Sequence, residues 1–358
     1  MARLTWAILT GEYPPQPGGV GDYTRQLAGR LADAGDEVHV WTGPRSGDPP
    51  SDPGVRLHHL PGRFGPASLA RLDRELSRLR RPTRLLVQYV PHAFGWKGMN
   101  YPFCLWIRTY RRHPVWVMFH EVACPVRRSQ PWKHDLLGRV TRLMAAALGR
   151  SARRLFVSTP AWETVLRSLA PVRPRIGWLP VPSNLPTEPP PELAARVRRQ
   201  VAPDPGALVI GHFGTFGSLV APLLAGALGP LLSADSRRVG LLIGPGGNQF
   251  ARALEGAYPS AAGRLFASGL LPGPDAAGHL AACDLLVQPY PDGVTTRRGS
   301  LMAGLALGRA IVTTKGALSE AFWDESGAVL LTPADEPGAA LSAAEALLTD
   351  PGRRARLG

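Results

Sequence analysis

Several segments of the sequence combine glycine or arginine with positions that suit phosphate binding. Glycines cluster after three predicted strands, within residues 18–21, 214–217 and 244–247. Turns of this kind let the backbone approach an anion, and a following helix N-terminus adds a positive dipole. Arg297 and Arg298 stand just before another predicted helix, and guanidinium groups bind phosphate oxygens bidentately. These patterns predict a site for an anionic, phosphate-bearing ligand.

The elements that would position these residues alternate along the chain. The predicted strands are 4–9, 37–42, 84–90, 115–120, 155–158, 208–213, 240–243, 285–289 and 310–313. The predicted helices include 22–34, 69–79, 136–148, 221–232 and 300–307. This alternation indicates parallel sheets, in which ligands lie beyond the carboxyl ends of the strands. We expect an α/β fold of two Rossmann-like, doubly wound domains that face each other across a cleft.

The length of the chain allows two hydrophobic cores of ordinary size. It has 358 residues, 44% of them hydrophobic, and single cores stop growing before this length. A proline-rich stretch, 181–206, interrupts helical and strand patterns and is the candidate linker. The predicted domains are therefore residues 1–180 and 207–358.

Composition excludes several classes of protein. The three cysteines form no C-x-x-C pair, and no metal-ligand cluster, P-loop or nucleophile elbow occurs, so no metal and no other cofactor are expected. No apolar run reaches the roughly 18 to 20 residues of a membrane-spanning helix. The formal charge of +14 favours anionic partners such as nucleotide diphosphates or lipid headgroups. No nucleic-acid-binding module stands out, so nucleic acid is not an expected partner. We expect a cytoplasmic protein that could sit peripherally on the inner face of the membrane, with 71–81 and 108–112 as contacts.

A series of motifs runs along nearly the whole chain. It comprises E-Y-P-P at 12–15, G-G-V-G-D-Y at 18–23, G-D-E-V-H-V at 35–40, F-H-E at 119–121 and G-A-L-S-E at 316–320. Together with the segment 327–358, these motifs resemble the retaining GT-B glycosyltransferases of family 4, with Asp36 where histidine is usual. The resemblance implies transfer of a sugar from a nucleotide-diphosphate sugar to an acceptor, with retention of the anomeric configuration.

The donor-site motif of that family is altered in this sequence. The family carries two glutamates eight positions apart, and alignment on Gly308 puts Thr295 and Ala303 at their positions. The family's Arg and Lys after the first strand of the second domain are also missing. Segments such as 88–91, 94–95, 97–99 and 182–184 indicate a divergent subgroup.

The missing cations require other groups to neutralise a diphosphate. The proposed donor phosphate-binding residues are Arg297, Arg298, Lys315, Gly214, Thr215, Gly217 and Gly19. The alternative is that the two arginines are solvated loop charges. The residues expected near the donor sugar or ribose are Thr295, Ser300 and Glu320, although Glu320 could equally be a carboxylate at a helix start.

By resemblance, His120 would hydrogen-bond the donor sugar, and it is the first catalytic candidate. A buried structural histidine is the alternative. Glu121 is the second candidate, and its carboxylate could orient His120, bind the acceptor or cap a turn.

Two loops of the first domain are expected to hold the acceptor. Their proposed contacts are Gly18, Gly21, Asp22, Tyr89, His92, Phe94 and Lys97. Aromatic faces suit sugar rings. The alternatives are a tight strand-to-helix turn for the glycines and packing within the domain for the aromatic loop.

The sequence thus predicts a glycosyltransferase that acts on a glycan, a lipid-linked or a small-molecule acceptor. The loss of both glutamates supports a second hypothesis, a catalytically degenerate homologue that binds a sugar nucleotide or glycan as a scaffold protein.

Overall fold

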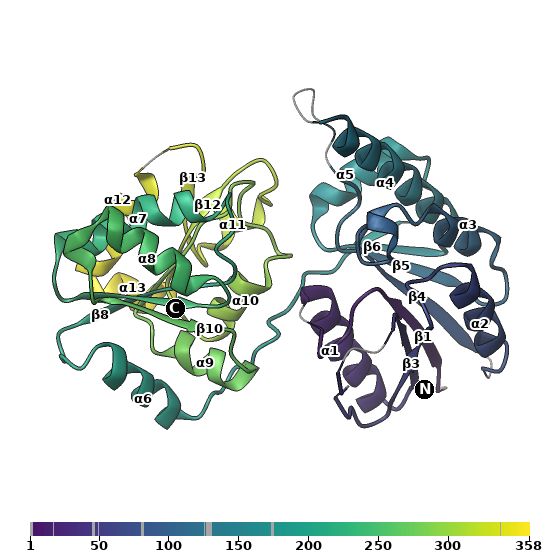
Figure 1. Ribbon diagram of the computed structural model, residues 1–358, viewed down its shortest axis with the longest axis horizontal. Helices are drawn as coiled ribbons and strands as arrows, with labels where there is room; N and C mark the ends of the chain where they lie inside the picture. The colour runs from purple at the N-terminus through teal and green to yellow at the C-terminus, as the bar shows by residue number, and fades with distance from the viewer. Residues whose placement is uncertain are drawn as a thin grey trace. The chain divides into compact units, whose positions relative to one another are not determined.

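The computed structural model describes residues 3–16, 18–44, 47–48, 50–79, 82–124, 126, 131–172, 175–336 and 338–358. The chain divides into two compact units, Met1–Pro180 and Val181–Gly358. Each unit has one parallel sheet flanked by helices (Figure 1), which confirms the prediction of two parallel-sheet α/β domains. None of the helices in the described residues combines the length and the apolarity needed to cross a bilayer.

The sheet of unit 1 has the strand order β3-β2-β1-β4-β5-β6-β7. Its strands are β1 Thr5–Thr10, β2 Glu37–Thr42, β3 Val55–His59, β4 Thr83–Tyr89, β5 Val115–Phe119, β6 Arg154–Val157 and β7 Ile176–Trp178. β1 lies between β2 and β4 and is buried along its whole length. Strands covered on both faces read as continuous apolar runs, which is why its sequence does not alternate.

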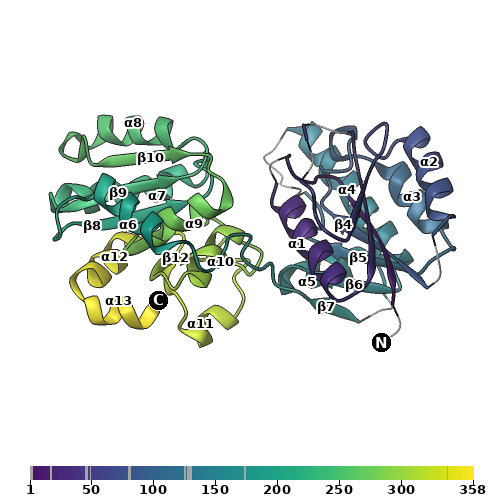
Figure 2. The same cartoon turned by 90° about the horizontal axis from the view of Figure 1, so that it is seen from below.

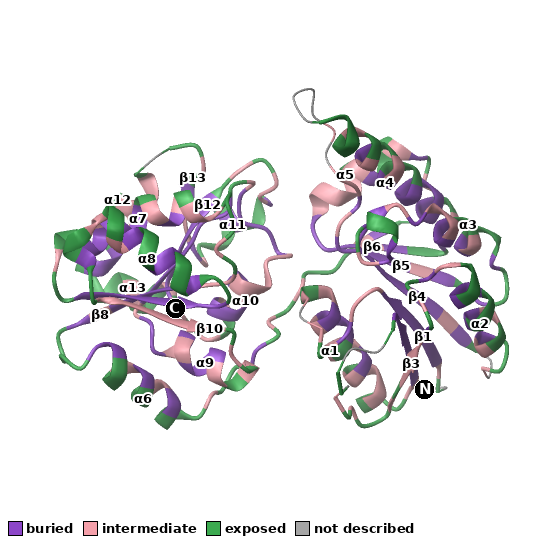
Figure 3. Ribbon diagram, in the orientation of Figure 1, coloured by how far each residue is buried: buried purple, intermediate pink, exposed green. Residues whose placement is uncertain are grey.

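Helices cover the two faces of this sheet differently. They are α1 Gly19–Asp33, α2 Pro66–Leu76, α3 Tyr101–Thr109, α4 Trp132–Ser151 and α5 Pro160–Leu169, with the 3₁₀ turn η1 Trp96–Gly98. α1 lies on the opposite side of the sheet from α2 and α3 (Figure 1). Alternate residues of β1, Ala7 and Leu9, join the core beneath α2 to α5, and the strands of both units are largely buried (Figure 3).

The sheet of unit 2 has the order β10-β9-β8-β11-β12-β13. Its strands are β8 Leu208–Phe213, β9 Arg238–Ile243, β10 Leu265–Gly269, β11 Leu285–Gln288, β12 Ile311–Lys315 and β13 Leu330–Pro333. Its helices are α6 Pro191–Val201, α7 Ala221–Ala234, α8 Gly247–Ala257, α9 Gly273–Ala281, α10 Gly299–Ala306, α11 Phe322–Ser326, α12 Ala339–Thr349 and α13 Pro351–Leu357, with the 3₁₀ turn η2 Pro259–Ala261.

The stretch 181–206, expected as a linker, is instead part of unit 2. It contains α6, which begins at Pro191 and packs against α9 (Figure 2). Leu193 and Val197 of α6 enter the core of unit 2. Proline is tolerated in the first turn of a helix, so the prolines before and at the start of α6 do not prevent it from forming.

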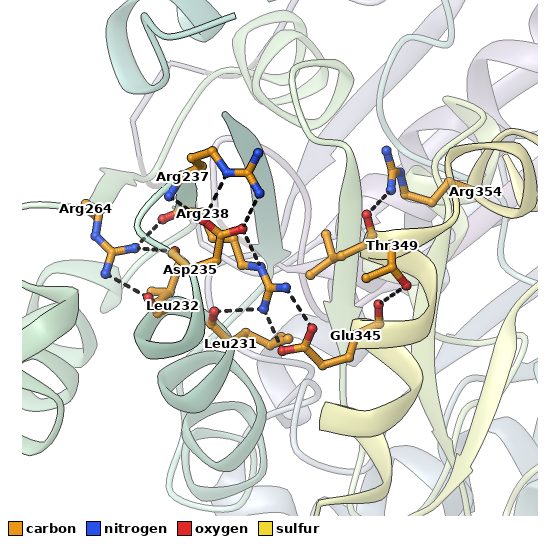
Figure 4. Close-up of polar contacts among 10 residues, drawn as sticks. Leu231, Leu232, Asp235, Arg237, Arg238, Arg264, Glu345, Thr349 and Arg354 are labelled. Carbon is orange, nitrogen blue, oxygen red and sulfur yellow. Dashed lines mark hydrogen bonds and ion pairs between the residues drawn. The ribbon is translucent and has the colours of Figure 1, made fainter. Parts of the chain in front are cut away.

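Arginines hold the amino ends of the unit 2 strands. Arg238, the first residue of β9, donates to the α7 carbonyl of Leu231 (3.0 Å) and makes two bonds to the Glu345 carboxylate of α12 (2.6 and 2.7 Å). Arg264 donates to the α7 carbonyl of Leu232 (2.7 Å) (Figure 4). The last carbonyls of a helix have no partner within it, so these guanidinium groups cap α7 and tie it to α12.

Candidate active site

A glycine turn follows each of the strands β8 and β9, and the two turns are in close contact. Gly214 and Gly244 follow these strands with φ angles of 142° and 129°, which side-chain-bearing residues rarely adopt. A Cβ atom on Gly244 would lie 2.1 Å from the carbonyl oxygen of Gly214. Thr215 and Gly217 are exposed in the first turn. The carboxyl edge of the unit 2 sheet therefore has an exposed glycine turn after β8. Turns of this kind let backbone N–H groups approach a phosphate.

Arg297 and Arg298 share one carboxylate in the loop between β11 and α10. Arg297 Nη2 lies 3.1 Å from Asp292 Oδ2, and Arg298 Nη2 donates to Asp292 Oδ1. Their side chains are only 17% and 24% exposed, so the alternative of solvated loop charges does not describe them. Both cations are partly buried, and electrostatic interactions there are stronger than in water.

Aromatic contact fixes the second arginine. The Arg298 guanidinium lies 4.6 Å from the centre of the Tyr290 ring, and the Tyr290 hydroxyl hydrogen-bonds Ser300 Oγ (2.9 Å) at the start of α10. Burial, and then Arg297, lower the pKa of Arg298 from its ordinary value. Its Nε atom is buried and has no hydrogen-bond partner in the described residues. A buried guanidinium donor without a partner is costly unless a ligand or water satisfies it.

The Glu320 carboxylate is held by hydrogen bonds within unit 2, and its contact with the donor sugar stays a prediction. Its carboxylate accepts hydrogen bonds from Thr296 N (3.0 Å), Thr296 Oγ1 (2.8 Å) and Trp323 Nε1 (2.7 Å). It is 8% exposed. Glu320 therefore links the loop between β11 and α10, at Thr296, to the connection between β12 and α11.

The other donor-side candidates have different surroundings. Thr295 and Ala303, at the positions of the two family glutamates, are fully buried, and Thr295 Oγ1 has no partner in the described residues. Ser300 lies beside Gly214, where a Cβ would come within 3.8 Å of its hydroxyl. Lys315 is half exposed and forms an ion pair with Asp324 (2.7 Å).

Two residues at this edge were not predicted from the sequence. His212 is the last residue but one of β8, Gln288 is the last residue of β11, and both are buried. His212 Nδ1 donates to Val287 O (2.9 Å) and Gln288 Nε2 donates to Phe213 O (3.1 Å). In the described residues, His212 Nε2 and Gln288 Oε1 have no partner. Polar residues closing otherwise apolar strands are the signal that could have identified them.

In unit 1, a carboxylate occupies part of the first glycine loop. Glu12 Oε1 accepts from the amides of Val20 (3.1 Å) and Gly21 (3.3 Å) in the first turn of α1. A Cβ on Gly18 would lie 2.4 Å from this carboxylate. The expectation that Gly21 contacts an acceptor is corrected, since its amide holds Glu12 and the residue is buried. Gly19 is exposed, and Gly18 and Asp22 are partly exposed.

His120 follows β5 and is held in a buried polar setting. Its Nε2 lies 2.8 Å from Gln88 Oε1, so Nε2 carries the proton and Nδ1 is the acceptor. The Tyr23 ring meets it edge-on at 4.8 Å, and its carbonyl accepts from Trp162 Nε1 (2.9 Å). Burial lowers the pKa of His120 to about 3, so the imidazole is neutral and can exchange hydrogen bonds. Glu121 is partly exposed.

The aromatic loop after β4 divides into core and surface residues. Tyr89 and Phe94 are fully buried, and the Phe94 ring stacks on Phe103 at 4.4 Å. Both were expected to contact an acceptor, and the structure corrects this, because their ring faces pack within unit 1. His92 and Lys97 are exposed and remain available.

Buried histidines make the stability of the protein depend on pH. Burial lowers the pKa of His120 to about 3 and that of His212 to about 4. Below about pH 6.5 these histidines bind protons in the unfolded chain but not in the folded chain. The stability that comes from keeping them neutral is therefore complete above that pH and is lost as the pH falls. We expect the free energy of unfolding to fall between pH 7 and pH 5, by up to about 2 kcal/mol for each histidine.

Denaturant unfolding of a His212→Gln variant measures this contribution. Its free energy of unfolding should change less between pH 7 and pH 5 than that of the wild type, while the exposed His92→Gln control keeps the wild-type dependence. An identical pH dependence in all three proteins would show that His212 titrates alike in both states.

Residues 18–182 match the family model described as the glycosyl transferase 4-like domain. Solved structures resemble the whole chain. Sucrose-phosphate synthase from Thermosynechococcus elongatus is 18% identical, with 99% of this chain and 92% of that chain covered and a TM-score of 0.74. WaaG, a glycosyltransferase involved in lipopolysaccharide biosynthesis, is 16% identical, with 98% and 92% covered and a TM-score of 0.69.

HepE from Anabaena, solved in complex with UDP and glucose, is 14% identical, with 99% of this chain and 92% of that chain covered and a TM-score of 0.66. The search of curated proteins finds no match. Together, the two parallel-sheet units and these similarities show that the chain has the GT-B fold of glycosyltransferases.

Proposed function

We propose that the protein is a glycosyltransferase that moves a sugar from a nucleotide-diphosphate sugar to a glycan, lipid-linked or small-molecule acceptor. The observation that carries the proposal is the Arg297–Arg298 pair, two partly buried cations that both contact the carboxylate of Asp292. The pair follows β11, at the strand end where ligands lie in parallel sheets. The similarity to HepE, whose structure contains UDP, supports a nucleotide donor.

The chemistry explains why cations matter here. Cleavage of the bond between sugar and diphosphate leaves negative charge on the diphosphate, and fixed positive groups stabilise that charge in the transition state. Arg298 has the unpartnered Nε donor for this role, and the exposed turn at Thr215 and Gly217 adds backbone amides. A metal is not part of the proposal. No cluster of three or more His, Cys, Asp or Glu side chains suited to a metal ion occurs in the described residues.

Thermal unfolding with a panel of ligands tests the donor class. We expect one family of nucleoside diphosphates and nucleotide sugars to stabilise the protein selectively, by about 2.7 kcal/mol at 100 times the dissociation constant. Inorganic phosphate and adenosine serve as controls for charge and base alone. The absence of a shift with every nucleotide would contradict the proposed donor site.

Retention of configuration is the finer part of the proposal and is supported by the resemblance to retaining enzymes. NMR of the first product formed from an α-linked donor should show an α-linked sugar. A β-linked product would exclude retention of the anomeric configuration.

One observation favours a second function. Thr295 and Ala303 are fully buried where the resembled family carries carboxylates. A protein with this arrangement could bind a sugar nucleotide as a scaffold without turning it over. Selective nucleotide stabilisation without hydrolysis or transfer, across a panel of acceptors, would support the scaffold function over the enzyme.

A further inference from the structure

Helix α4 of unit 1 exposes three large apolar side chains along one face. Trp132, Leu136 and Leu143 are 70%, 46% and 59% exposed. Their spacings of four and seven residues place them in one stripe. Met144 and Leu148 lie about 100° and 140° around the helix from Leu143 and are fully buried, so the helix already has its core contact on another side. The stripe is therefore not required for packing within unit 1.

A second tryptophan lies on an adjoining turn. Trp96 in η1 is 50% exposed, and Lys97 beside it is exposed as well. The turn contacts α4 at Leu137, which follows Leu136 in the chain but lies about 100° around the helix from it, since a Cβ on Gly98 would lie 3.3 Å from the Leu137 side chain. Both Trp96 and Lys97 have positive φ angles, 52° and 53°, a conformation that non-glycine residues seldom adopt. We call these residues and the α4 stripe the Trp96–Leu143 surface.

The charged residues of this surface are mostly cations. Lys97, Lys133, Arg139 and Arg142 are exposed. The acidic residue of α4 is Asp135, which is partly buried. Two of the chain's three lysines therefore lie beside its two most exposed tryptophans. Apolar side chains flanked by cations suit a partner that is apolar inside and negative at its surface.

We infer that the Trp96–Leu143 surface binds an anionic lipid bilayer. Tryptophan prefers the level of the lipid headgroups, where its ring is half in an apolar medium, and lysine and arginine attract anionic headgroups. A second copy of the chain fits less well, because a symmetric contact would bring the cations of both copies together. The predicted contacts 71–81 and 108–112 differ, because none of their described residues is a large apolar side chain that is exposed.

Vesicle flotation tests the inference. The wild-type protein should bind vesicles of phosphatidylcholine with about 30% phosphatidylglycerol more than phosphatidylcholine alone, and raised salt should weaken this binding. The triple variant Trp132→Ser/Leu136→Ser/Leu143→Ser should lower the partition coefficient at least about tenfold. The matched control is Leu219→Ser/Leu270→Ser, which removes two leucines of unit 2 that are 71% and 72% exposed. It should bind as the wild type does.

Further measurements keep the test independent of folding and of sugar transfer. The charge-reversal variant Lys133→Glu/Arg139→Glu leaves the apolar stripe intact and should also lose binding to anionic vesicles. Circular dichroism confirms that each variant is folded. Three results would overturn the inference: no binding of the wild type to anionic vesicles, equal binding by the triple variant, or a wild-type dimer that the triple variant dissociates.

Discussion

Replacing Arg298 with alanine is expected to lower kcat/KM for sugar transfer about 10²- to 10³-fold. Removing one preorganised hydrogen-bond donor from a site that stabilises developing charge has an effect of this order, because the lost interaction stabilises mainly the transition state. Arg298 is the partly buried cation with an unpartnered Nε, held over Tyr290 beside the start of α10. Steady-state kinetics with the donor found by thermal unfolding measures the loss, and nucleotide stabilisation should fall with it.

Two variants separate this role from a structural one. Arg298→Lys keeps the charge but not the two-pronged geometry, and it should recover part of the rate. Arg252→Ala removes an exposed arginine of α8 and should leave the kinetics unchanged. Wild-type kcat/KM and nucleotide stabilisation in Arg298→Ala would mean that the arginine only neutralises Asp292.

The sheets could be predicted from the sequence wherever a strand is a buried apolar run. β2 and β8 have the predicted bounds, since β2 alternates polar and apolar residues, β8 is mostly apolar, and turn residues follow each of them. β3 was not predicted, because Val55–His59 is only partly buried and contains Arg56 and two histidines. An edge strand with one neighbour lacks the continuous apolar signal of a central strand.

Long-range contacts explain what the sequence could not predict in the site. Glu12 lies eight residues before Val20, and only the folded turn brings its carboxylate to the start of α1. Glu320 reaches Thr296, 24 residues earlier, through the neighbouring strands β11 and β12. A motif shows which residue type is present, but whether its side chain faces a ligand or the protein depends on tertiary packing.

Burial separates residues that look alike in the sequence. Tyr89 ends β4, and Phe94 and Trp96 follow within the next seven residues, yet the first two are core residues and the third is half exposed. Aromatic type alone suggested a sugar-binding role for the whole loop. The alternation of core and surface positions follows from the turn at residues 95–98, where successive residues have positive φ angles.

Replacing Glu345 with alanine is expected to lower the free energy of unfolding by about 3 kcal/mol. The Arg238 side chain is 8% exposed and makes two bonds to Glu345 (Figure 4), so the substitution leaves a buried guanidinium group with only the more distant Asp235 carboxylate, at 4.0 Å, as a counter-charge. Denaturant unfolding, with the signal of each unit followed where the transitions separate, measures the loss.

The size of this effect depends on burial rather than on the presence of an ion pair. Glu336→Ala, which removes an exposed carboxylate before α12, should change stability by less than about 0.5 kcal/mol. Arg238→Met combined with Glu345→Leu should be less destabilising than Glu345→Ala alone, because neither charge then stays buried without a partner. A loss below about 1 kcal/mol in Glu345→Ala would show that water reaches Arg238 and that the pair behaves as a surface salt bridge.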